Sequence, residues 1–154
     1  VEALGQTKSS LGVLRLEAEP PELAPSPRLA QADGLLAPAR EAGLDVSLRT
    51  EGRERELPDT VEMCGYRVIQ ESLTNVVRHA RATTVRIIVA YEHESLVVTI
   101  EDDGSSSDDG PVRTGAGIEG MRERVGLIGG SLDAGQRATG GWMVRAMLPA
   151  GDRS

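Results

Sequence analysis

Four polar residues near the middle of the chain could serve phosphate chemistry. Glu71, Asn75 and His79 recur every four residues, and Arg78 adjoins them. On a helix, a step of four residues turns the side chain by only about 40°, so these three residues share one face. An amide oxygen is a hard ligand for Mg²⁺ that adds no charge beside phosphates. A solvated helix surface is the other interpretation of the same stripe.

A second polar group follows an apolar run, where residues 100–104 read Ile-Glu-Asp-Asp-Gly. At the end of a strand, Asp102 could accept a hydrogen bond from an exocyclic amine such as adenine N6. Gly104, two residues later, would let a flat base approach the backbone. An ordinary Asp-Gly turn would have the same sequence, so this segment is open to both interpretations.

A third feature, residues 115–120, is a glycine-rich entry to a predicted helix, with the sequence Gly-Ala-Gly-Ile-Glu-Gly. Backbone N–H groups there would lie at the positive end of the helix dipole, where phosphates bind. The segment lacks the strand context of a dinucleotide fingerprint and the Gly-Lys-Ser/Thr of a Walker loop. Alone, it is equally compatible with a flexible loop end.

The helix that carries the polar stripe is predicted over residues 59–81. Asp59 and Glu62 have the spacing of a capping box at its start. Its opposite face is apolar and consists of Tyr66, Ile69, Leu73, Val76 and Ala80. A helix with one apolar stripe packs that stripe against a core, which leaves the polar stripe available for other contacts.

Alternating apolar residues predict strands at 44–48, 85–89 and 96–100, with a hairpin turn at residues 93–95. Two closing strands are predicted near 131–136 and 142–148. A second helix is marked by Ile118, Met121, Val125 and Ile128 and ends at residues 129–130. Residues 103–114 are too polar to pack and are expected to form a mobile loop. The predicted fold is an α/β two-layer sandwich, with helices on one face of a mixed or antiparallel sheet.

The residues upstream of these elements divide into a helical pattern, a linker and a second short helix. Leu4, Leu11 and Leu14 have approximately helical spacing, and Val13 and Leu16 add apolar surface. Residues 19–27 contain four prolines in nine residues, as a linker would. A helix is expected within part of residues 29–42, a span that includes Pro38, and it is expected to end at Gly43. We therefore expect a first segment at 1–28, a domain at 29–150 and a short tail at 151–154.

Composition excludes several functions. A net charge of −7 argues against a nucleic-acid partner, which would need clustered Lys and Arg. The single cysteine, Cys64, excludes an internal disulfide and a multi-cysteine zinc site, and is expected to be an inert thiol. No apolar run approaches the roughly 20 residues that span a bilayer, and no signal-peptide pattern is present. We expect a cytoplasmic fragment without membrane contact, although a longer parent could be membrane-anchored.

The order and spacing of the three polar features resemble the GHKL ATPase superfamily, which has a Bergerat-type ATP-binding fold. Within it, the sequence is similar to the sensor histidine kinases of the nitrate-sensor-like group. Residues 70–80 resemble that group's N box, residues 102–104 its first glycine box, and residues 115–125 its second glycine box with the following helix. Residues 129–132 and 140–149 complete the pattern. The resemblance is strong over residues 59–149 and fainter over residues 4–50.

The resemblance implies roles for the polar stripe. Glu71 would be the catalytic residue that orients or deprotonates a water or an acceptor group. Asn75 would ligate Mg²⁺, and Arg78 and His79 would face the phosphates of ATP. Phosphoryl transfer needs mainly positioning and charge neutralisation, which these residue types supply.

The resemblance also implies how the nucleotide is held. Asp102 would bind adenine N6, and Gly104 would give the ring room. Gly115, Gly117 and the neighbouring N–H groups would hold the phosphate tail of ATP, and Ile118 would be a further residue of the ATP-binding site. Residues 103–114 would form the ATP lid.

Two positions depart from the family pattern, and the acceptor histidine of the family is not recognisable. Ser106 replaces a glycine of the first glycine box, and Trp142 stands where many relatives have Thr; both changes could weaken nucleotide affinity. His79 and His93 are the two histidines, and neither has the His-Asp context of an acceptor. The implied partners are ATP or ADP, a dimerisation and phosphoacceptor domain of the same parent, and a response regulator.

Two alternatives remain open on the sequence alone. An anti-sigma-factor serine kinase would share the nucleotide site but would lack the upstream apolar pattern of residues 4–16. A nucleotide-binding module without catalysis would account for Ser106 and Trp142. The intact pair of Glu71 and Asn75 argues against the second alternative.

Overall fold

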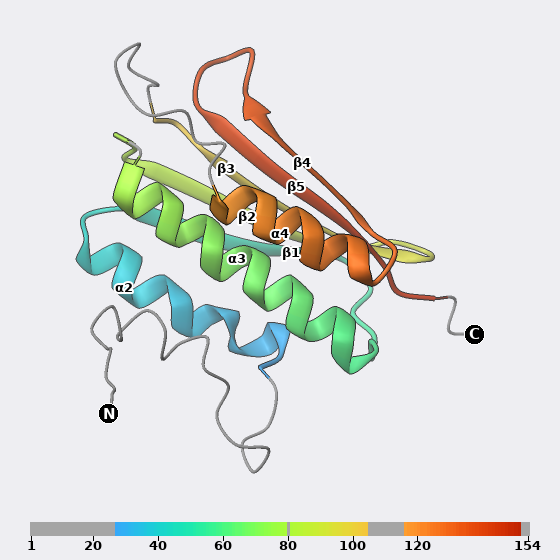
Figure 1. Cartoon of the computed structure of the whole chain (residues 1–154). Helices are drawn as coiled ribbons and strands as arrows, with labels where there is room; N and C mark the ends of the chain where they lie inside the picture. The colour runs from blue at the N-terminus through green and yellow to red at the C-terminus, as the bar shows by residue number, and fades with distance from the viewer. Residues whose placement is uncertain (1–26, 80, 105–115, 152–154) are drawn as a thin grey trace, which may run out of the picture.

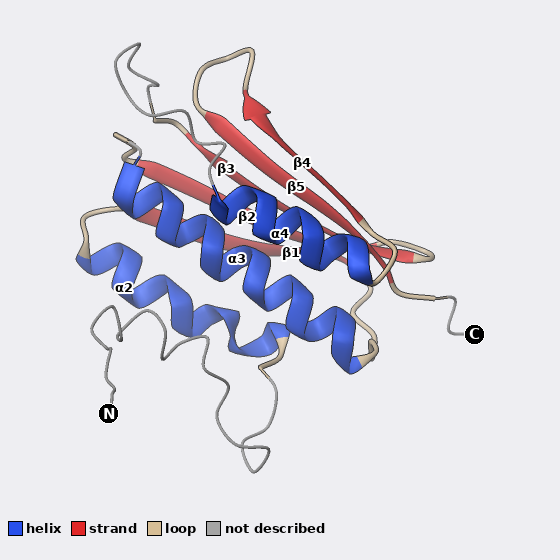
Figure 2. Cartoon of the chain, in the orientation of Figure 1, coloured by secondary structure: helices blue, strands red, loops and turns tan. Residues whose placement is uncertain are grey.

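A computed structural model describes residues 27–79, 81–104 and 116–151, and these form two layers (Figures 1 and 2). One layer is a five-stranded sheet with the strand order β1-β2-β3-β5-β4. Its strands are β1 (Asp45–Gly52), β2 (Thr84–Tyr91), β3 (Ser95–Asp102), β4 (Ser131–Gln136) and β5 (Trp142–Pro149). β1 and β2 are parallel and the other neighbours are antiparallel, so the sheet is mixed.

The second layer consists of helices that all lie on the same face of the sheet (Figure 2). They are a 3₁₀ segment η2 (Leu29–Leu35), α2 (Leu36–Glu41), α3 (Asp59–His79) and α4 (Ala116–Leu127). The predicted two-layer α/β sandwich is confirmed. No helix in the described part of the chain is both long and apolar enough to cross a membrane.

The core lies between the sheet and the helices, and the predicted periodicities account for it. On β2 and β3 the buried residues include the alternating positions Val85, Ile87, Val89, Leu96, Val98 and Ile100. On α3 and α4 they include Ile69, Leu73, Val76, Ile118, Met121 and Val125. Aliphatic side chains of this size contribute about 1.5–3 kcal/mol each when fully buried. Cys64 is also buried, as expected of an inert thiol, and burial raises the pKa of its thiol.

The helical segment after residue 28 continues through Pro38, as expected. Pro38 is the third residue of α2, where a missing N–H breaks no helical hydrogen bond. The chain ends the helix at Glu41 and enters β1 two residues after Gly43. This short helical segment covers the β1 side of the sheet and lies beside α3 (Figure 1).

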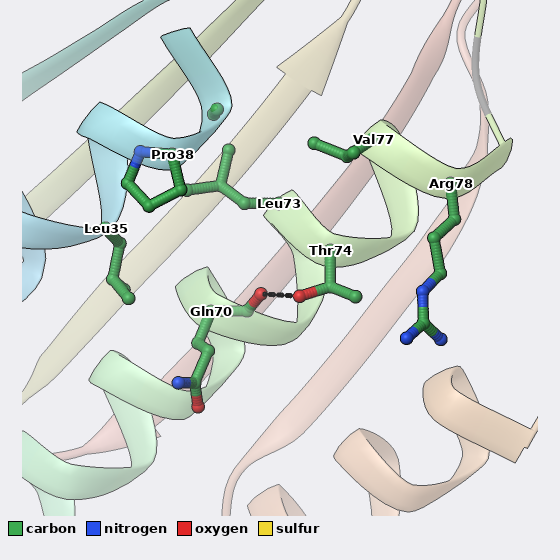
Figure 3. Close-up of a pocket in the computed structure, with 8 residues that line it drawn as sticks. Leu35, Pro38, Gln70, Leu73, Thr74, Val77 and Arg78 are labelled. Atoms are coloured by element: carbon green, nitrogen blue, oxygen red, sulfur yellow. Dashed lines mark hydrogen bonds between the residues drawn. The ribbon is translucent and has the colours of Figure 1, made fainter. Parts of the chain in front are cut away.

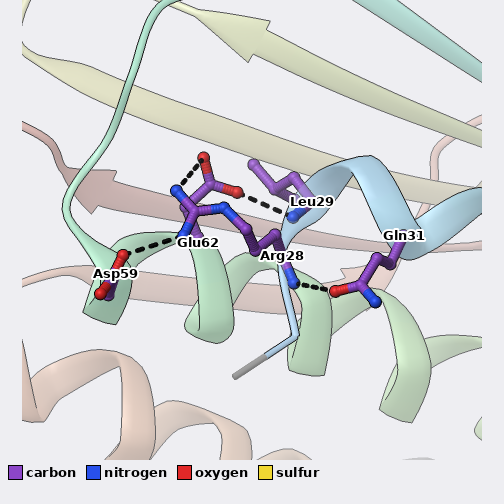
Figure 4. Close-up of polar contacts among 5 residues, drawn as sticks. All are labelled: Arg28, Leu29, Gln31, Asp59 and Glu62. Carbon is purple, nitrogen blue, oxygen red and sulfur yellow. Dashed lines mark hydrogen bonds and ion pairs between the residues drawn. The ribbon is translucent and has the colours of Figure 1, made fainter. Parts of the chain in front are cut away.

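Four groups fasten the start of this segment to the first turn of α3, and we call them the entry clamp: the Arg28 side chain, the Leu29 N–H, and the Asp59 and Glu62 carboxylates (Figure 4). Glu62 Oε1 accepts a hydrogen bond from the Leu29 N–H at 2.8 Å, and Glu62 is buried. Arg28 Nη1 lies 3.0 Å from Asp59 Oδ1, and Arg28 Nη2 lies 3.8 Å from Glu62 Oε2. The clamp fixes where the preceding chain meets the domain.

The prediction of a capping box at the start of α3 is wrong. Glu62 does not turn back to Asp59, because the buried Leu29 N–H, 33 positions away, takes its carboxylate. The N–H groups of Val61 and Glu62 are instead bonded to the Pro58 carbonyl, each at 3.0 Å. A buried donor without an acceptor is costly, so the tertiary contact outweighs the local cap.

Replacing Glu62 with Leu is expected to lower the free energy of unfolding by about 2–3 kcal/mol, because the buried Leu29 N–H loses its acceptor. Urea denaturation followed by circular dichroism measures this. The matched control is Asp59→Asn, which weakens an exposed ion pair and is expected to cost less than about 1 kcal/mol. Equal losses in the two variants would contradict the assigned role of Glu62.

Candidate functional site

The polar stripe of α3 faces the first turn of α4. A Cβ atom placed on Gly117 would lie 2.8 Å from Glu71 Oε2 and 3.6 Å from Asn75 Oδ1. Glu71 and Asn75 are both half-buried. For these two residues, the alternative of a solvated helix surface is therefore wrong. The carboxylate also lies at the N-terminal end of α4, where the helix dipole favours negative charge.

The glycine at residue 117 lets α4 pass close to Glu71 without displacing the end of that side chain. At 2.8 Å, a methyl group would overlap the Glu71 carboxylate oxygen, and one of the two side chains would have to move. The missing side chain lets the backbone of α4 approach Glu71 and Asn75 directly. Glycine at 117 thus serves close approach of backbone to polar side chains.

A small pocket joins all three polar features that the sequence singled out. It is lined by residues from α3, β3, α4 and β5: Ser72, Asn75, Val76, Ile100, Asp102, Ile118, Trp142 and Val144. The described residues enclose about 10 Å³ there, which is close to the space of one water molecule. Asn75 belongs both to this pocket and to the cluster with Glu71 and Gly117, so it connects the two.

Asp102 is the buried acid of the pocket, with 3% of its surface exposed. It is the last residue of β3, and its Oδ1 accepts a hydrogen bond from the Gly104 N–H at 2.8 Å. The turn between β4 and β5 closes over its backbone: a Cβ on Gly141 would lie 2.0 Å from the Asp102 carbonyl oxygen. Gly141 also has φ +92°, a conformation that favours glycine. β3 and this turn together fix the backbone of Asp102, and the Gly104 N–H holds its carboxylate.

Asp103, the next residue, has a structural role that the sequence analysis missed. Its Oδ1 accepts hydrogen bonds from the N–H groups of Thr83 (2.9 Å) and Thr84 (3.0 Å), and its Oδ2 accepts one from the Thr83 hydroxyl (2.8 Å). The hydrogen bond from the Thr84 backbone, followed by those from the Thr83 hydroxyl and backbone, lowers the pKa of Asp103 to about 2. Asp103 thus ties the end of β3 to the start of β2, and the expectation that the mobile loop begins at this residue is wrong.

Asp103 makes the stability of the fold pH-dependent at acidic pH. Its pKa falls from an ordinary 3.8 to about 2, so its stabilisation is present above pH 4 and is lost as pH falls towards 2. Asp103→Asn is expected to cost less than about 1 kcal/mol at pH 7, since the group is exposed. Urea unfolding at several pH values should show the difference between wild type and variant shrinking from pH 4 to pH 2. A difference that stays constant over this range would contradict the assignment.

The remaining predicted site residues fall into four groups. Gly104 and Ile118 are buried, and Ile118 lines the pocket. Arg78 is exposed and lines an outer groove between α2 and α3, not the inner pocket (Figure 3). His79 is the last residue of α3. Gly115 and most of the expected lid, residues 105–114, lie outside the described residues.

The residues present fit a Mg²⁺ ion that is shared with a nucleotide. Among the described residues, no three His, Cys, Asp or Glu side chains form a cluster that could hold a metal alone. Mg²⁺ is usually bound by one or two protein oxygens together with substrate phosphates and water. The Asn75 amide oxygen, half-buried beside Glu71, would be a ligand of this kind.

Comparison with known proteins agrees with this geometry. Residues 61–152 match the family described as histidine kinase-, DNA gyrase B-, and HSP90-like ATPase. The sensor histidine kinase YxjM of Bacillus subtilis is 38% identical over 118 residues, which are 75% of this chain and 29% of that protein. The histidine-protein kinase/phosphatase UhpB of Salmonella typhimurium is 40% identical over 96 residues, 62% of this chain and 19% of that protein. The chain thus spans less than a third of either relative.

Solved structures show the same fold. The blue-light activated histidine kinase of Erythrobacter litoralis EL346 aligns with a TM-score of 0.64 at 24% identity, over 80% of this chain and 42% of that one. The catalytic domain of the histidine kinase ThkA aligns with a TM-score of 0.61 at 16% identity, over 79% of this chain and 89% of that one. The chain belongs to the family of histidine kinase-, DNA gyrase B- and HSP90-like ATPases, and it is a catalytic ATPase domain of the histidine kinase type.

Proposed function

We propose that this domain binds Mg-ATP between α3, α4 and the ends of β3 and β5, and transfers the γ-phosphoryl group to a histidine on a separate domain. The observation that carries the proposal is the position of Asn75. This residue lines the pocket around Asp102 and also lies beside Glu71 at the first turn of α4. A nucleotide with its base at Asp102 would therefore have its phosphates near an Mg²⁺ ligand, a carboxylate and a helix N-terminus.

At the base end of the site, Asp102 would accept a hydrogen bond from adenine N6. Its Oδ1 already accepts one from the Gly104 N–H, and a carboxylate has further acceptor capacity. Ile118 and Val144 supply apolar walls, and Gly104 lets the ring approach the backbone. Trp142 also lines this pocket, half-buried, so we expect the base to contact an indole at this position.

At the phosphate end, Asn75 would hold Mg²⁺, which neutralises charge on the phosphates. His79 and the backbone of residues 115–117 would contribute further contacts to the phosphates, whereas Arg78 lines the outer groove between α2 and α3. Glu71 would orient or deprotonate the acceptor imidazole as its nitrogen attacks the γ-phosphorus and ADP leaves. Positioning and charge neutralisation account for most catalysis in reactions of this type.

We place this domain within a larger two-component signalling protein. Residues 1–28 would be the end of a dimerisation helix with its proline-rich linker, residues 29–150 the catalytic domain, and residues 151–154 a tail. The dimerisation domain would be of the nitrate-sensor-like type and would carry the acceptor histidine for relay to a response regulator. In the parent protein, this domain would lie in the cytoplasm, where ATP is available. Support comes from the named sensor kinases among the relatives and from the apolar pattern of residues 4–16.

The direct test is to incubate the chain with γ-labelled ATP, Mg²⁺ and the dimerisation domain of its parent protein. The expected product is a labelled dimerisation domain whose phosphate is lost in acid and retained in alkali, as for phosphohistidine. An acid-stable label on a serine would favour a serine kinase instead. Nucleotide binding without transfer would favour a non-catalytic module.

A further inference from the structure

The outer face of the helical layer contains a groove that the nucleotide site does not use. It lies between α2 and α3 and is lined by Leu35, Pro38, Ala39, Gln70, Leu73, Thr74, Val77 and Arg78 (Figure 3). Its volume is about 310 Å³, at the lower end of the range for ligand pockets. Figure 3 shows Leu35 and Pro38 facing the α3 residues Leu73 and Val77 across the groove.

The chemistry of the groove suits aliphatic side chains. The Thr74 hydroxyl already donates its proton to the Gln70 carbonyl at 3.0 Å. It is therefore not available as a donor to a polar ligand in the groove. Val77 is 46% exposed, although it lies in the last turn of a helix whose other aliphatic residues are largely buried. Arg78 is the charged residue of the lining. An occupant should therefore present apolar residues to Val77 and a carboxylate to Arg78.

We propose that the groove is the docking site for residues 4–16 of this same chain. These residues supply Leu11, Val13, Leu14 and Leu16 within six positions, and the acids Glu17 and Glu19 follow at once. The occupant thus combines aliphatic side chains with the charge that complements Arg78. This inference concerns how the domain is held against the segment before it, and it does not depend on nucleotide binding.

The linker is long enough for this contact. The entry clamp fixes the chain at Arg28 and Leu29. From there, the helical path to Pro38 covers only about 15–20 Å. An extended chain from Leu16 to Arg28 spans up to about 40 Å. The proline-rich residues 19–27 can therefore return along α2 and bring Leu14 and Leu16 to the groove.

A cross-linking experiment on the full chain tests the proposal. Leu14 and Val77 are both changed to Cys, and a short bismaleimide is added; native Cys64 is buried and does not compete. The control pair is Leu14→Cys with Leu127→Cys, because Leu127 also ends a helix and is 86% exposed. Because both cysteines of each pair belong to one chain, the connecting residues alone bring them together some of the time. The cross-linking rates of the two pairs are therefore compared. We expect the Val77 pair to react at least about tenfold faster, within one chain.

Two results of this experiment would overturn the proposal. Equal rates in the two pairs would show that residues 4–16 do not prefer the groove. A cross-linked dimer in place of an internally linked chain would show that a second copy fills it. The experiment is repeated with Leu11→Cys in place of Leu14→Cys, so that docking is also detected if Leu11 and not Leu14 lies beside Val77.

Limited trypsin digestion gives a second, independent measurement without cross-linking. Val77→Asp would place a charge in the groove, and cleavage after Arg15 is then expected to accelerate about fivefold or more, as a docked segment becomes accessible. Leu127→Asp is the matched control and should leave the cleavage rate unchanged. Circular dichroism checks that both variants are folded. Identical cleavage in wild type and Val77→Asp would contradict docking.

Discussion

Replacing Glu71 with Gln is expected to slow phosphoryl transfer to a restored acceptor domain by roughly 10²–10⁴-fold, the usual contribution of a general base. The amide has the shape of the carboxylate, so the packing against Gly117 should survive. It has no charge to orient or accept the proton of an acceptor group. Affinity for Mg-ATP should change little, because the lost function belongs to the transfer step. Single-turnover transfer with saturating Mg-ATP measures the effect.

The matched control for this experiment is Glu119→Gln. Glu119 also lies at the first turn of α4, but it is exposed and pairs with Arg122 at 2.8 Å. Its replacement should leave transfer near the wild-type rate. Transfer by Glu71→Gln at the wild-type rate would remove Glu71 from the reaction. A large loss of Mg-ATP affinity in that variant would show that Glu71 acts in binding.

Asn75→Ala is expected to weaken Mg-ATP binding by about 10–100-fold, the loss anticipated for one interaction with a charged group. Asn75 is the residue shared by the pocket of Asp102 and the cluster at Gly117. If its oxygen binds Mg²⁺, the loss should be large with Mg²⁺ present and small when EDTA removes the metal. Calorimetry under the two conditions separates the metal effect from a change in the pocket wall.

Thr74→Ala provides the control for the Asn75 experiment. Thr74 is the adjacent residue of α3, and its hydroxyl bonds the Gln70 carbonyl on the groove side of the helix. The Thr74→Ala variant should bind Mg-ATP with the affinity of the wild type. Normal binding of Mg-ATP by Asn75→Ala would show that the metal assignment is wrong. An equal loss with and without Mg²⁺ would assign Asn75 to the pocket alone.

Local periodicity predicted the elements of this fold because each element contains its own signal. The alternation in Val85, Ile87 and Val89 and the helical spacing of Ile69, Leu73 and Val76 depend only on the secondary structure they occupy. The approach of Glu71 and Asn75 to Gly117 could be anticipated only from the family resemblance, since α3 and α4 are separated by two strands.

The predictions that failed depend on contacts between distant parts of the chain. Glu62 has the local spacing of a cap, yet its carboxylate binds the Leu29 N–H, 33 residues away. Asp103 resembles the start of a polar loop, yet it is anchored by Thr83 and Thr84. The weak signal for this contact is a pair of threonines, Thr83 and Thr84, at the start of β2, together with an Asp directly after the adjacent strand β3.

The position of Arg78 follows from helix geometry once the partner helices are known. Arg78 continues the stripe of Gln70 and Thr74, which is rotated by about 100° from the stripe of Glu71 and Asn75. The first stripe borders α2 and the second borders α4. The sequence shows both stripes but not which helix packs against each.

The most direct test of this account is a calorimetric titration of Mg-ATP into the wild-type chain and into Asp102→Asn. The wild type is expected to bind with a dissociation constant of roughly 1 μM, equivalent to about −8 kcal/mol. Asn can still accept the hydrogen bond of the Gly104 N–H, but it presents an N–H where the adenine amine needs an acceptor. Affinity should fall about tenfold or more. Asp103→Asn, next along the chain, should bind as the wild type does. Equal affinity of wild type and Asp102→Asn would contradict the placement of adenine at Asp102.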